Sequence, residues 1–222
     1  MSFNILSIQN QDDVIRHKAY LDTFEKMYLK YFPMDDERED FENIINRISG
    51  GNLPPTFINL AIMDNKVIGG IVVDYYPECN SIEPIYLAVD ELYRRHGVGK
   101  KLIEYSTTNN PNVKHTFLEC DNPSLVSVEE SAMDPAVRLN MYIKMGFSII
   151  PIDYVQPPLS EEKDYERKLL LLHKGVALNA DDLIAFLSVF YEYLGYKTSS
   201  ELDNMIKKIN YDRDRLFLNT NA

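Results

Sequence analysis

The chain has 222 residues, a formal net charge of −11 at pH 7 and 45% hydrophobic residues. This composition predicts a globular protein with a sizeable core and argues against a disordered chain. The acidic excess argues against a nucleic-acid partner and suits a cationic one. No apolar run reaches the length of a membrane span, and the N-terminus lacks the pattern of a signal peptide. We therefore expect a cytoplasmic protein with no membrane partner.

Cysteine and histidine give no sign of a disulfide framework or a metal site. Cys79 and Cys120 are the only cysteines, and we expect free thiols rather than a single bridge. The four histidines are scattered without the spacing of metal ligands. The sequence therefore predicts no metal cofactor.

The first part of the chain predicts a strand over residues 3–8 and a helix over residues 12–31 that Pro33 ends. A second helix follows, with apolar residues at positions 41, 44, 45 and 48 and a stop at Gly50 and Gly51. The link between these helices is acidic. We interpret it as a solvated helix start, with a substrate-facing role as the alternative. Its carboxylates are Asp35, Asp36, Glu37, Glu39 and Asp40.

Residues 56–63 and 66–76 read as a hairpin about Asp64 and Asn65. Gly69 and Gly70 inside its second strand indicate a bulge or a close backbone approach. Residues 82–89 are almost unbroken apolar, which is typical of a strand buried on both faces.

A basic, glycine-containing turn follows that strand and leads into a helix of apolar period 3.6. Gly97 and Gly99 allow a ligand to approach the backbone closely. The free N–H groups and the dipole at the start of the next helix favour an anion. Four basic side chains flank the glycines, so the turn predicts a phosphate or pyrophosphate site: Arg94, Arg95, Lys100 and Lys101.

The remaining pattern alternates strands and helices, which indicates an α/β fold. We expect strands over 115–120, 147–152 and 167–173, and a helix that begins at Asp134-Pro135 and closes at Gly146. Gly175 is interpreted as a boundary between residues 1–175 and an extension of two helices over 176–222. These helices are expected to pack on the core or on a partner chain, the latter as a homodimer.

The turn Arg94-x-x-Gly97-x-Gly99 does not have the spacing of a nucleoside-triphosphate loop. It does not fit a dinucleotide fingerprint either, because position 102 is Leu where that motif requires a third glycine. It resembles the pyrophosphate loop of the GNAT N-acetyltransferase superfamily, which uses acetyl-coenzyme A. A second signature of that family, Tyr-x-x-x-Gly-Phe, matches residues 142–147. The resemblance covers residues 3–173. It implies a mixed, mostly antiparallel central sheet with helices on both faces, to which the C-terminal helices are added.

The resemblance also implies how the co-substrate is held, without a metal. Pantetheine would lie between the strands of residues 82–89 and 116–120, and main-chain groups of the first strand would pair with it. The turn would hold the pyrophosphate. The residues implied in cofactor binding are Leu87, Ala88, Val89, Arg94, Arg95, His96, Gly97, Val98, Gly99, Lys100 and Lys101.

In this family an amine attacks the thioester directly, which requires a base for the ammonium and an acid for the thiolate. Tyr142 stands where many members carry the acid, and a core tyrosine is the alternative. Glu83 lies eleven residues before Arg94, the spacing of the catalytic glutamate in histone-acetylating members. A water chain or Glu119 could serve as base instead. Cys120 is interpreted as a structural thiol.

The sequence thus predicts an N-acetyltransferase acting on a primary amine of a small molecule or peptide, with a cationic acceptor favoured. The alternative is a catalytically silent acyl-coenzyme A-binding or scaffold protein. The polar loop of residues 121–131 and the C-terminal helices depart from the family pattern, so the acceptor stays open. Residues 153–159 resemble a segment of some bacterial members, and we attach no substrate to it.

Overall fold

The computed structural model describes residues 2–33, 38–50, 54–131, 133–159 and 163–213. The chain forms two compact units. The first comprises Met1–Tyr75 and Ile82–Val113, and the second comprises Tyr76–Ser81 and Lys114–Ala222.

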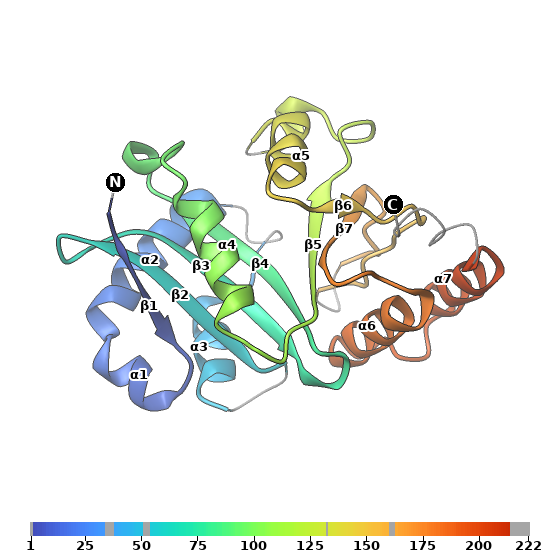
Figure 1. Ribbon diagram of the computed structural model, residues 1–222, viewed down its shortest axis with the longest axis horizontal. Coiled ribbons are helices and arrows are strands. Elements are labelled where there is room, and N and C mark those ends of the chain that lie inside the picture. The colour runs from blue at the N-terminus through green and yellow to red at the C-terminus, as the bar shows by residue number, and fades with distance from the viewer. Residues whose placement is uncertain (1, 34–37, 51–53, 132, 160–162, 214–222) are drawn as a thin grey trace. The chain divides into compact units, whose positions relative to one another are not determined.

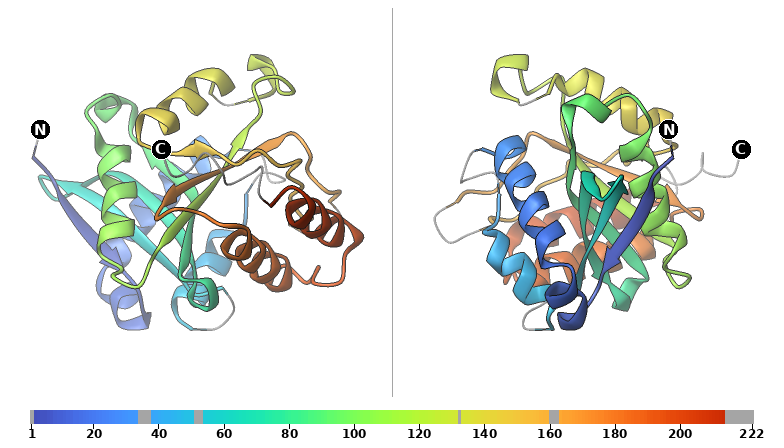
Figure 2. Two further views of the ribbon diagram at one scale, coloured as in Figure 1. Left: turned by 45° about the vertical axis from the view of Figure 1, so that its right-hand side comes forward. Right: turned by 90° about the vertical axis from the view of Figure 1, so that its left-hand side faces the viewer.

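The first unit is a sheet with helices on both faces. Its strands follow the order β1-β2-β3-β4, and β2 pairs antiparallel with both β1 and β3. The helices α2 and α3 cover one face and α4 covers the other (Figures 1 and 2). The elements are β1 (Asn4–Ile8), α1 (Gln11–Arg16), α2 (Lys18–Tyr31), α3 (Phe41–Ile48), β2 (Thr56–Met63), β3 (Lys66–Tyr76), β4 (Ser81–Val89), the 3-10 turn η2 (Glu91–Tyr93) and α4 (Val98–Thr108).

Alternation along β2 separates the two faces of this unit. Ile58 and Leu60 pack into a core with Phe24 of α2 and Ile44 of α3. Asn59 points to the other face, where its amide donates to the hydroxyl of Ser106 in α4 at 2.9 Å.

The hairpin of β2 and β3 forms as predicted. Asp64 and Asn65 both have left-handed backbones, with φ of 49° and 59°, as a tight type I′ turn requires. The register shifts beside Gly69, so a bulge is present. Gly70 is a close approach as well, since a Cβ there would lie 2.5 Å from the ring of Phe24.

The second unit contains the strand order β5-β7-β6, with β7 antiparallel to both neighbours. Cys120 of β5 faces α5, and Phe117 faces α6. The elements are the 3-10 turn η1 (Pro77–Cys79), β5 (His115–Asp121), the 3-10 turn η3 (Val128–Glu130), α5 (Pro135–Lys144), β6 (Ser148–Ile149), β7 (Leu169–Gly175), α6 (Ala180–Tyr193) and α7 (Ser200–Tyr211).

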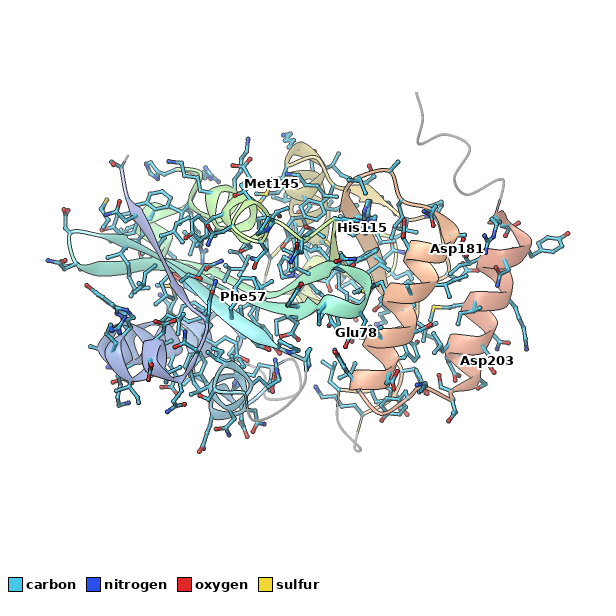
Figure 3. The ribbon with its side chains drawn as sticks, turned by 60° about the horizontal axis from the view of Figure 1, so that its bottom comes forward. Phe57, Glu78, His115, Met145, Asp181 and Asp203 are labelled. Atoms are coloured by element: carbon cyan, nitrogen blue, oxygen red, sulfur yellow. The ribbon has the colours of Figure 1, made fainter. Side chains whose placement is uncertain are left out.

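The C-terminal helices are part of the core of the second unit. Phe186 of α6 stacks on Phe117 with ring centroids 3.8 Å apart. The helices α6 and α7 lie side by side, and Figure 3 labels Asp181 and Asp203 on them. Leu202 and Met205 of α7 join the same core. The division into residues 1–175 and 176–222 stays a prediction.

Three elements differ from the sequence prediction. The helix expected over residues 12–31 is two helices, because His17 leaves the helical region with φ −111° and ψ 21°. The strand expected over 147–152 is reduced to Ser148–Ile149, since Pro151 has no N–H to donate. The strand expected over 167–173 is Leu169–Gly175, and it ends at a glycine because a Cβ there would clash with the carbonyl oxygen of Lys114. None of the helices within the described ranges is long and apolar enough to cross a membrane.

Candidate active site

The turn between β4 and α4 presents a helix start that suits an anion. Gly97 is the N-cap of α4, and no side chain caps this helix. The first helical bond runs from the N–H of Lys101 to the carbonyl of Gly97 at 3.0 Å. The N–H groups of Val98, Gly99 and Lys100 therefore have no helical acceptor, and the helix dipole adds a partial positive charge there.

The two glycines of the turn differ in backbone conformation and in surroundings. Gly97 has a left-handed φ of +79°, and a Cβ at this position would meet nothing within 4 Å. Gly99 is helical, and its Cβ would lie 3.4 Å from Cδ2 of Leu87, an ordinary contact. Gly97 thus borders open space, whereas position 99 has room for a Cβ beside Leu87 of β4.

The basic residues of the turn divide into two kinds. Arg94 donates to the carbonyl of Val89 at 3.1 Å and lies over the ring of Tyr31 at 4.6 Å, so it stabilises the turn. Lys101 lies over the ring of Phe3. Arg95, with a left-handed φ of 64°, and Lys100 are exposed. Exposed cations beside a helix start fit a pyrophosphate.

The end of β4 is held in place by contacts that sequence patterns did not indicate. The N–H of Asp90 donates to the carbonyl of Ile68 in the bulge at 3.0 Å, and the Asp90 carboxylate accepts from the N–H of Leu92. The hydroxyl of Tyr31 accepts from the N–H of Glu91 at 3.2 Å. These bonds fix the path from Leu87, Ala88 and Val89 to the turn. Tyr31 carried no signal beyond its place at a helix end.

The predicted base and acid belong to different units. Glu83 lies in β4 and is 1% exposed. Tyr142 lies in α5 of the second unit and is 8% exposed. Burial raises the pKa of the Tyr142 phenol to about 12, although Arg138 acts in the opposite direction. The phenol therefore stays protonated at neutral pH, as an acid must before it reacts.

Gly146 allows the Tyr-x-x-x-Gly-Phe signature to close the helix α5. It has a left-handed φ of +90°, and the N–H of Phe147 donates to the carbonyl of Tyr142 at 3.1 Å. The Phe147 ring then packs edge-on against the Tyr142 ring, with centroids 5.9 Å apart. The signature thus fixes the position of the tyrosine.

Cys120 and Cys79 are both free thiols, as expected. Cys120 is 1% exposed, and burial raises the pKa of its thiol to about 11. The thiol stays protonated at neutral pH, so the interpretation as a structural cysteine agrees with its surroundings.

Glu119 of β5 is a second carboxylate with an organised environment. The Tyr154 hydroxyl donates to its Oε1 and the Gln156 amide donates to its Oε2. Burial raises the pKa of Glu119 to about 7, although both hydrogen bonds lower it. Tyr154 and Gln156 were missed as functional candidates. Their only signal was their place in the segment 153–159, which resembled a family segment without a role.

Of the two polar segments near the predicted acceptor side, the acidic link is only partly described. Asp35, Asp36 and Glu37 lie outside the described residues. Glu39 forms an ion pair with Arg47, so its charge is offset. In the loop of residues 121–131, the Asp121 carboxylate accepts from the Ser131 hydroxyl at 2.8 Å and from Arg138 at 3.1 Å. Across the described ranges, no group of His, Cys, Asp and Glu is arranged to hold a metal ion.

Known proteins share this architecture. Residues 56–149 match the Acetyltransferase (GNAT) domain family. A GNAT-family acetyltransferase from Bacteroides thetaiotaomicron has a similar structure, with a TM-score of 0.63 and 23% identity, covering 90% of this chain and 100% of its own. No curated protein has a matching sequence.

Two further similar structures contain coenzyme A. An acetyltransferase from Bacillus subtilis in complex with CoA has a TM-score of 0.51 and 17% identity, covering 79% of this chain and 99% of its own. The PaiA N-acetyltransferase from Thermoplasma acidophilum, in complex with coenzyme A, has a TM-score of 0.51 and 16% identity, with the same coverage. The predicted resemblance and the fold are confirmed.

Proposed function

We propose that this chain acetylates a primary amine with acetyl-coenzyme A as co-substrate, since residues 56–149 match the Acetyltransferase (GNAT) domain family and the fold is similar to that of a GNAT-family acetyltransferase. The observation that carries this proposal is the uncapped N-terminus of α4 behind Gly97, which is a ready anion site. The coenzyme A complexes among the similar structures support the choice of anion.

The residues of the first unit fit the phosphates of coenzyme A. The N–H groups of Val98, Gly99 and Lys100 would bind the pyrophosphate, with Arg95 and Lys100 adding positive charge. Main-chain groups of Leu87, Ala88 and Val89 would align the pantetheine. The thioester supplies an activated acetyl group, and the chain's task is to position it and to move two protons.

Tyr142 is the proposed general acid. Its phenol carries a proton throughout the physiological pH range because burial raises its pKa to about 12. It can therefore donate to the sulfur as negative charge develops there. For the base, the candidates are Glu83, a water chain that reaches solvent, and Glu119.

The proposed acceptor is a cationic amine, such as a polyamine, an aminoglycoside or a lysine-bearing peptide. The net charge of −11 supports a cationic acceptor. Acetyl-coenzyme A is itself an anion and would occupy the basic residues of the turn, so the remaining surface stays acidic and attracts a cation. Electrostatic steering of this kind is screened by salt, with a Debye length of about 8 Å at physiological ionic strength. The alternative partner arrangement, a homodimer through the C-terminal helices, stays a prediction.

The test is thiol release from acetyl-coenzyme A with a panel of cationic and neutral primary amines. We expect release with at least one cationic amine, and a kcat/KM that falls as salt rises. The triple variant Asp35→Asn, Asp36→Asn, Glu37→Gln should lower that kcat/KM further while the KM for acetyl-coenzyme A stays constant. Binding of coenzyme A without thiol release would favour the silent binding protein. If the best acceptor is a neutral amine, the electrostatic argument is refuted, while the proposal of acetyl transfer stands.

A further inference from the structure

The turn that precedes α4 contains a residue whose backbone conformation is costly. Arg95 has a left-handed φ of 64°, although it is not a glycine. Apart from glycine, asparagine and aspartate adopt this conformation most readily, and other residues keep it only where surrounding contacts hold them. Because Arg95 is exposed, the contacts of its neighbours in the turn must hold it.

Tyr31, the last residue of α2, holds the chain on the N-terminal side of Arg95. The guanidinium of Arg94 lies over the Tyr31 ring, 4.6 Å from its centroid, and its Nε donates to the carbonyl of Val89 at 3.1 Å. The first distance is within the roughly 6 Å over which the face of an aromatic ring attracts a cation. The Tyr31 hydroxyl also accepts from the N–H of Glu91 at 3.2 Å. Tyr31 thus holds the chain at two points, Glu91 and Arg94.

His96 holds the chain on the other side of Arg95. Its Nδ1 lies 2.8 Å from the carbonyl oxygen of Arg94. A carbonyl oxygen can only accept a hydrogen bond, so Nδ1 carries the hydrogen. The bond joins the side chain of one neighbour of Arg95 to the main chain of the other, and so closes a small ring around the left-handed residue. Together with Tyr31, it fixes the path of the chain on both sides of Arg95.

The path of this turn determines how the start of α4 is presented to a ligand. Gly97, two residues after Arg95, is the N-cap of α4. A turn that is already held in its binding conformation binds a ligand more tightly than one that the ligand has to order. If only a fraction of the molecules has the binding conformation, the apparent Kd rises by the inverse of that fraction. The contacts of Tyr31 and His96 therefore bear on the affinity of the site.

We propose that Tyr31 and His96 are positioning residues for the pyrophosphate of coenzyme A. This inference rests on the proposed function and names the side chains that preset its anion site. Tyr31 acts through the Arg94 guanidinium and the N–H of Glu91, and His96 acts through the Arg94 carbonyl. The side chain of Arg94, which the family resemblance placed among the cofactor-binding residues, then supports the turn instead of binding a phosphate. The end of α2, which lies outside the motif of residues 94–99, becomes part of the cofactor site.

The first experiment measures coenzyme A binding by isothermal titration calorimetry. Tyr31→Leu removes the ring and the hydroxyl, and His96→Ala removes the imidazole donor. Each should raise the Kd about 10-fold if the binding conformation falls to about a tenth of the molecules. Tyr31→Phe keeps the ring under Arg94 and should lose less, and His96→Asn, with an amide N–H in place of the imidazole Nδ1, should stay near the wild type. Tyr20→Leu is the matched control: Tyr20, near the start of α2, stacks on His17, and its loss should leave the Kd unchanged.

The second experiment separates positioning of the pyrophosphate from general damage to the enzyme. Thiol release with the most active amine of the panel is measured from acetyl-coenzyme A and from S-acetylpantetheine, a truncated donor that lacks the pyrophosphate. Tyr31→Leu and His96→Ala should raise the KM for acetyl-coenzyme A about 10-fold, with kcat close to the wild-type value. Both variants should keep the wild-type kcat/KM for S-acetylpantetheine. Equal losses with the two donors would indicate a general structural role and overturn the assignment.

A double substitution tests the part played by the left-handed residue. Asparagine accepts this conformation more readily than arginine does, so the turn needs less support in Arg95→Asn. The factor by which His96→Ala raises the Kd should therefore be smaller in Arg95→Asn than in the wild type, although Arg95→Asn itself binds less tightly because it has lost a charge. Equal factors in the two backgrounds would overturn the argument from Arg95.

The outcomes separate this assignment from the proposed function. If the wild type binds coenzyme A and both Tyr31→Leu and His96→Ala bind it with the same Kd, these residues do not position the pyrophosphate, and the proposed function stands. If the wild type does not bind coenzyme A, the proposed function fails and the assignment fails with it. Thermal unfolding checks that each variant is folded. Should Tyr31→Leu not fold, Tyr31→Phe decides by the loss of the hydroxyl alone.

Discussion

Replacing Gly97 by valine separates the coenzyme A site from the stability of the fold. Gly97 has φ of +79°, and a Cβ there would meet nothing within 4 Å. The cost to folding is therefore the left-handed backbone alone, about 1–2 kcal/mol. A domain with an ordinary stability of about 5–15 kcal/mol stays folded under that strain. The new side chain would occupy the open space in front of the helix start.

The cost to binding follows from the N–H groups that the valine would cover. Each hydrogen bond to a charged group contributes about 1.5–3 kcal/mol. Loss of two such bonds weakens coenzyme A binding by about 100-fold or more, since about 1.4 kcal/mol is a factor of ten. Isothermal titration calorimetry with coenzyme A measures this directly, and thermal unfolding measures the strain.

The chain provides matched controls for the backbone strain. Gly50 and Gly195 have φ of +82° and +86°, and a Cβ at either would also meet nothing within 4 Å. Gly50→Val and Gly195→Val should lose the same stability and keep wild-type affinity for coenzyme A. Gly99→Ala should be tolerated too, because its Cβ makes an ordinary contact with Leu87. If Gly97→Val binds coenzyme A as well as the controls do, the pyrophosphate does not lie at this turn.

Three further predictions follow from buried groups. Tyr142→Phe should lower kcat about 10²-fold and leave the affinity for coenzyme A intact. The ratio of wild-type to variant kcat should be constant near neutral pH, because the wild-type phenol stays protonated. Unchanged turnover when chemistry is rate-limiting would make Tyr142 a structural residue. Burial and the neighbouring His115 lower the pKa of His173 to about 4. Between pH 6.5 and 4 the histidine takes up a proton in the unfolded chain but not in the folded protein. Over this range the free energy of unfolding should therefore fall on the order of 2 kcal/mol more in the wild type than in His173→Gln, as denaturant titrations at several pH values can measure. Arg47→Met should lower the free energy of unfolding by about 3–5 kcal/mol at pH 7, because it leaves buried Asp74 without its ion pair. Burial raises the pKa of Asp74 to about 6, so the loss should be smaller below pH 6, where that carboxyl takes up a proton. An equal loss at both pH values in urea unfolding would contradict the ion-pair argument.

The sequence allowed most of the first unit to be predicted because its signals are local. The hairpin about Asp64 and Asn65 depends on two adjacent residues that accept a left-handed backbone. The turn that is proposed to bind phosphate depends on Gly97 and on the apolar period of the following helix. Residue type and spacing alone determine such features.

The environment of Glu119 could not be predicted, since it depends on contacts between distant parts of the chain. Tyr154 and Gln156 lie 35 and 37 positions away from it in sequence. The hydroxyl of Tyr191, from a later helix, donates to the carbonyl of Val155 between them. No periodicity or motif reports which side chains meet across such separations. The same applies to Arg47, whose partners Glu39 and Asp74 come from a link and a strand.

Transfer of an isotopically labelled acetyl group distinguishes acetylation of an amine from hydrolysis of the thioester and from binding alone. The protein is incubated with acetyl-coenzyme A labelled with ¹³C in the acetyl group and with the most active amine of the panel, and mass spectrometry follows the label. We expect the label on the amine nitrogen, at a rate that falls in Gly97→Val and Tyr142→Phe and persists in Gly195→Val. Label found only in free acetate, or none leaving coenzyme A, would contradict the proposed function.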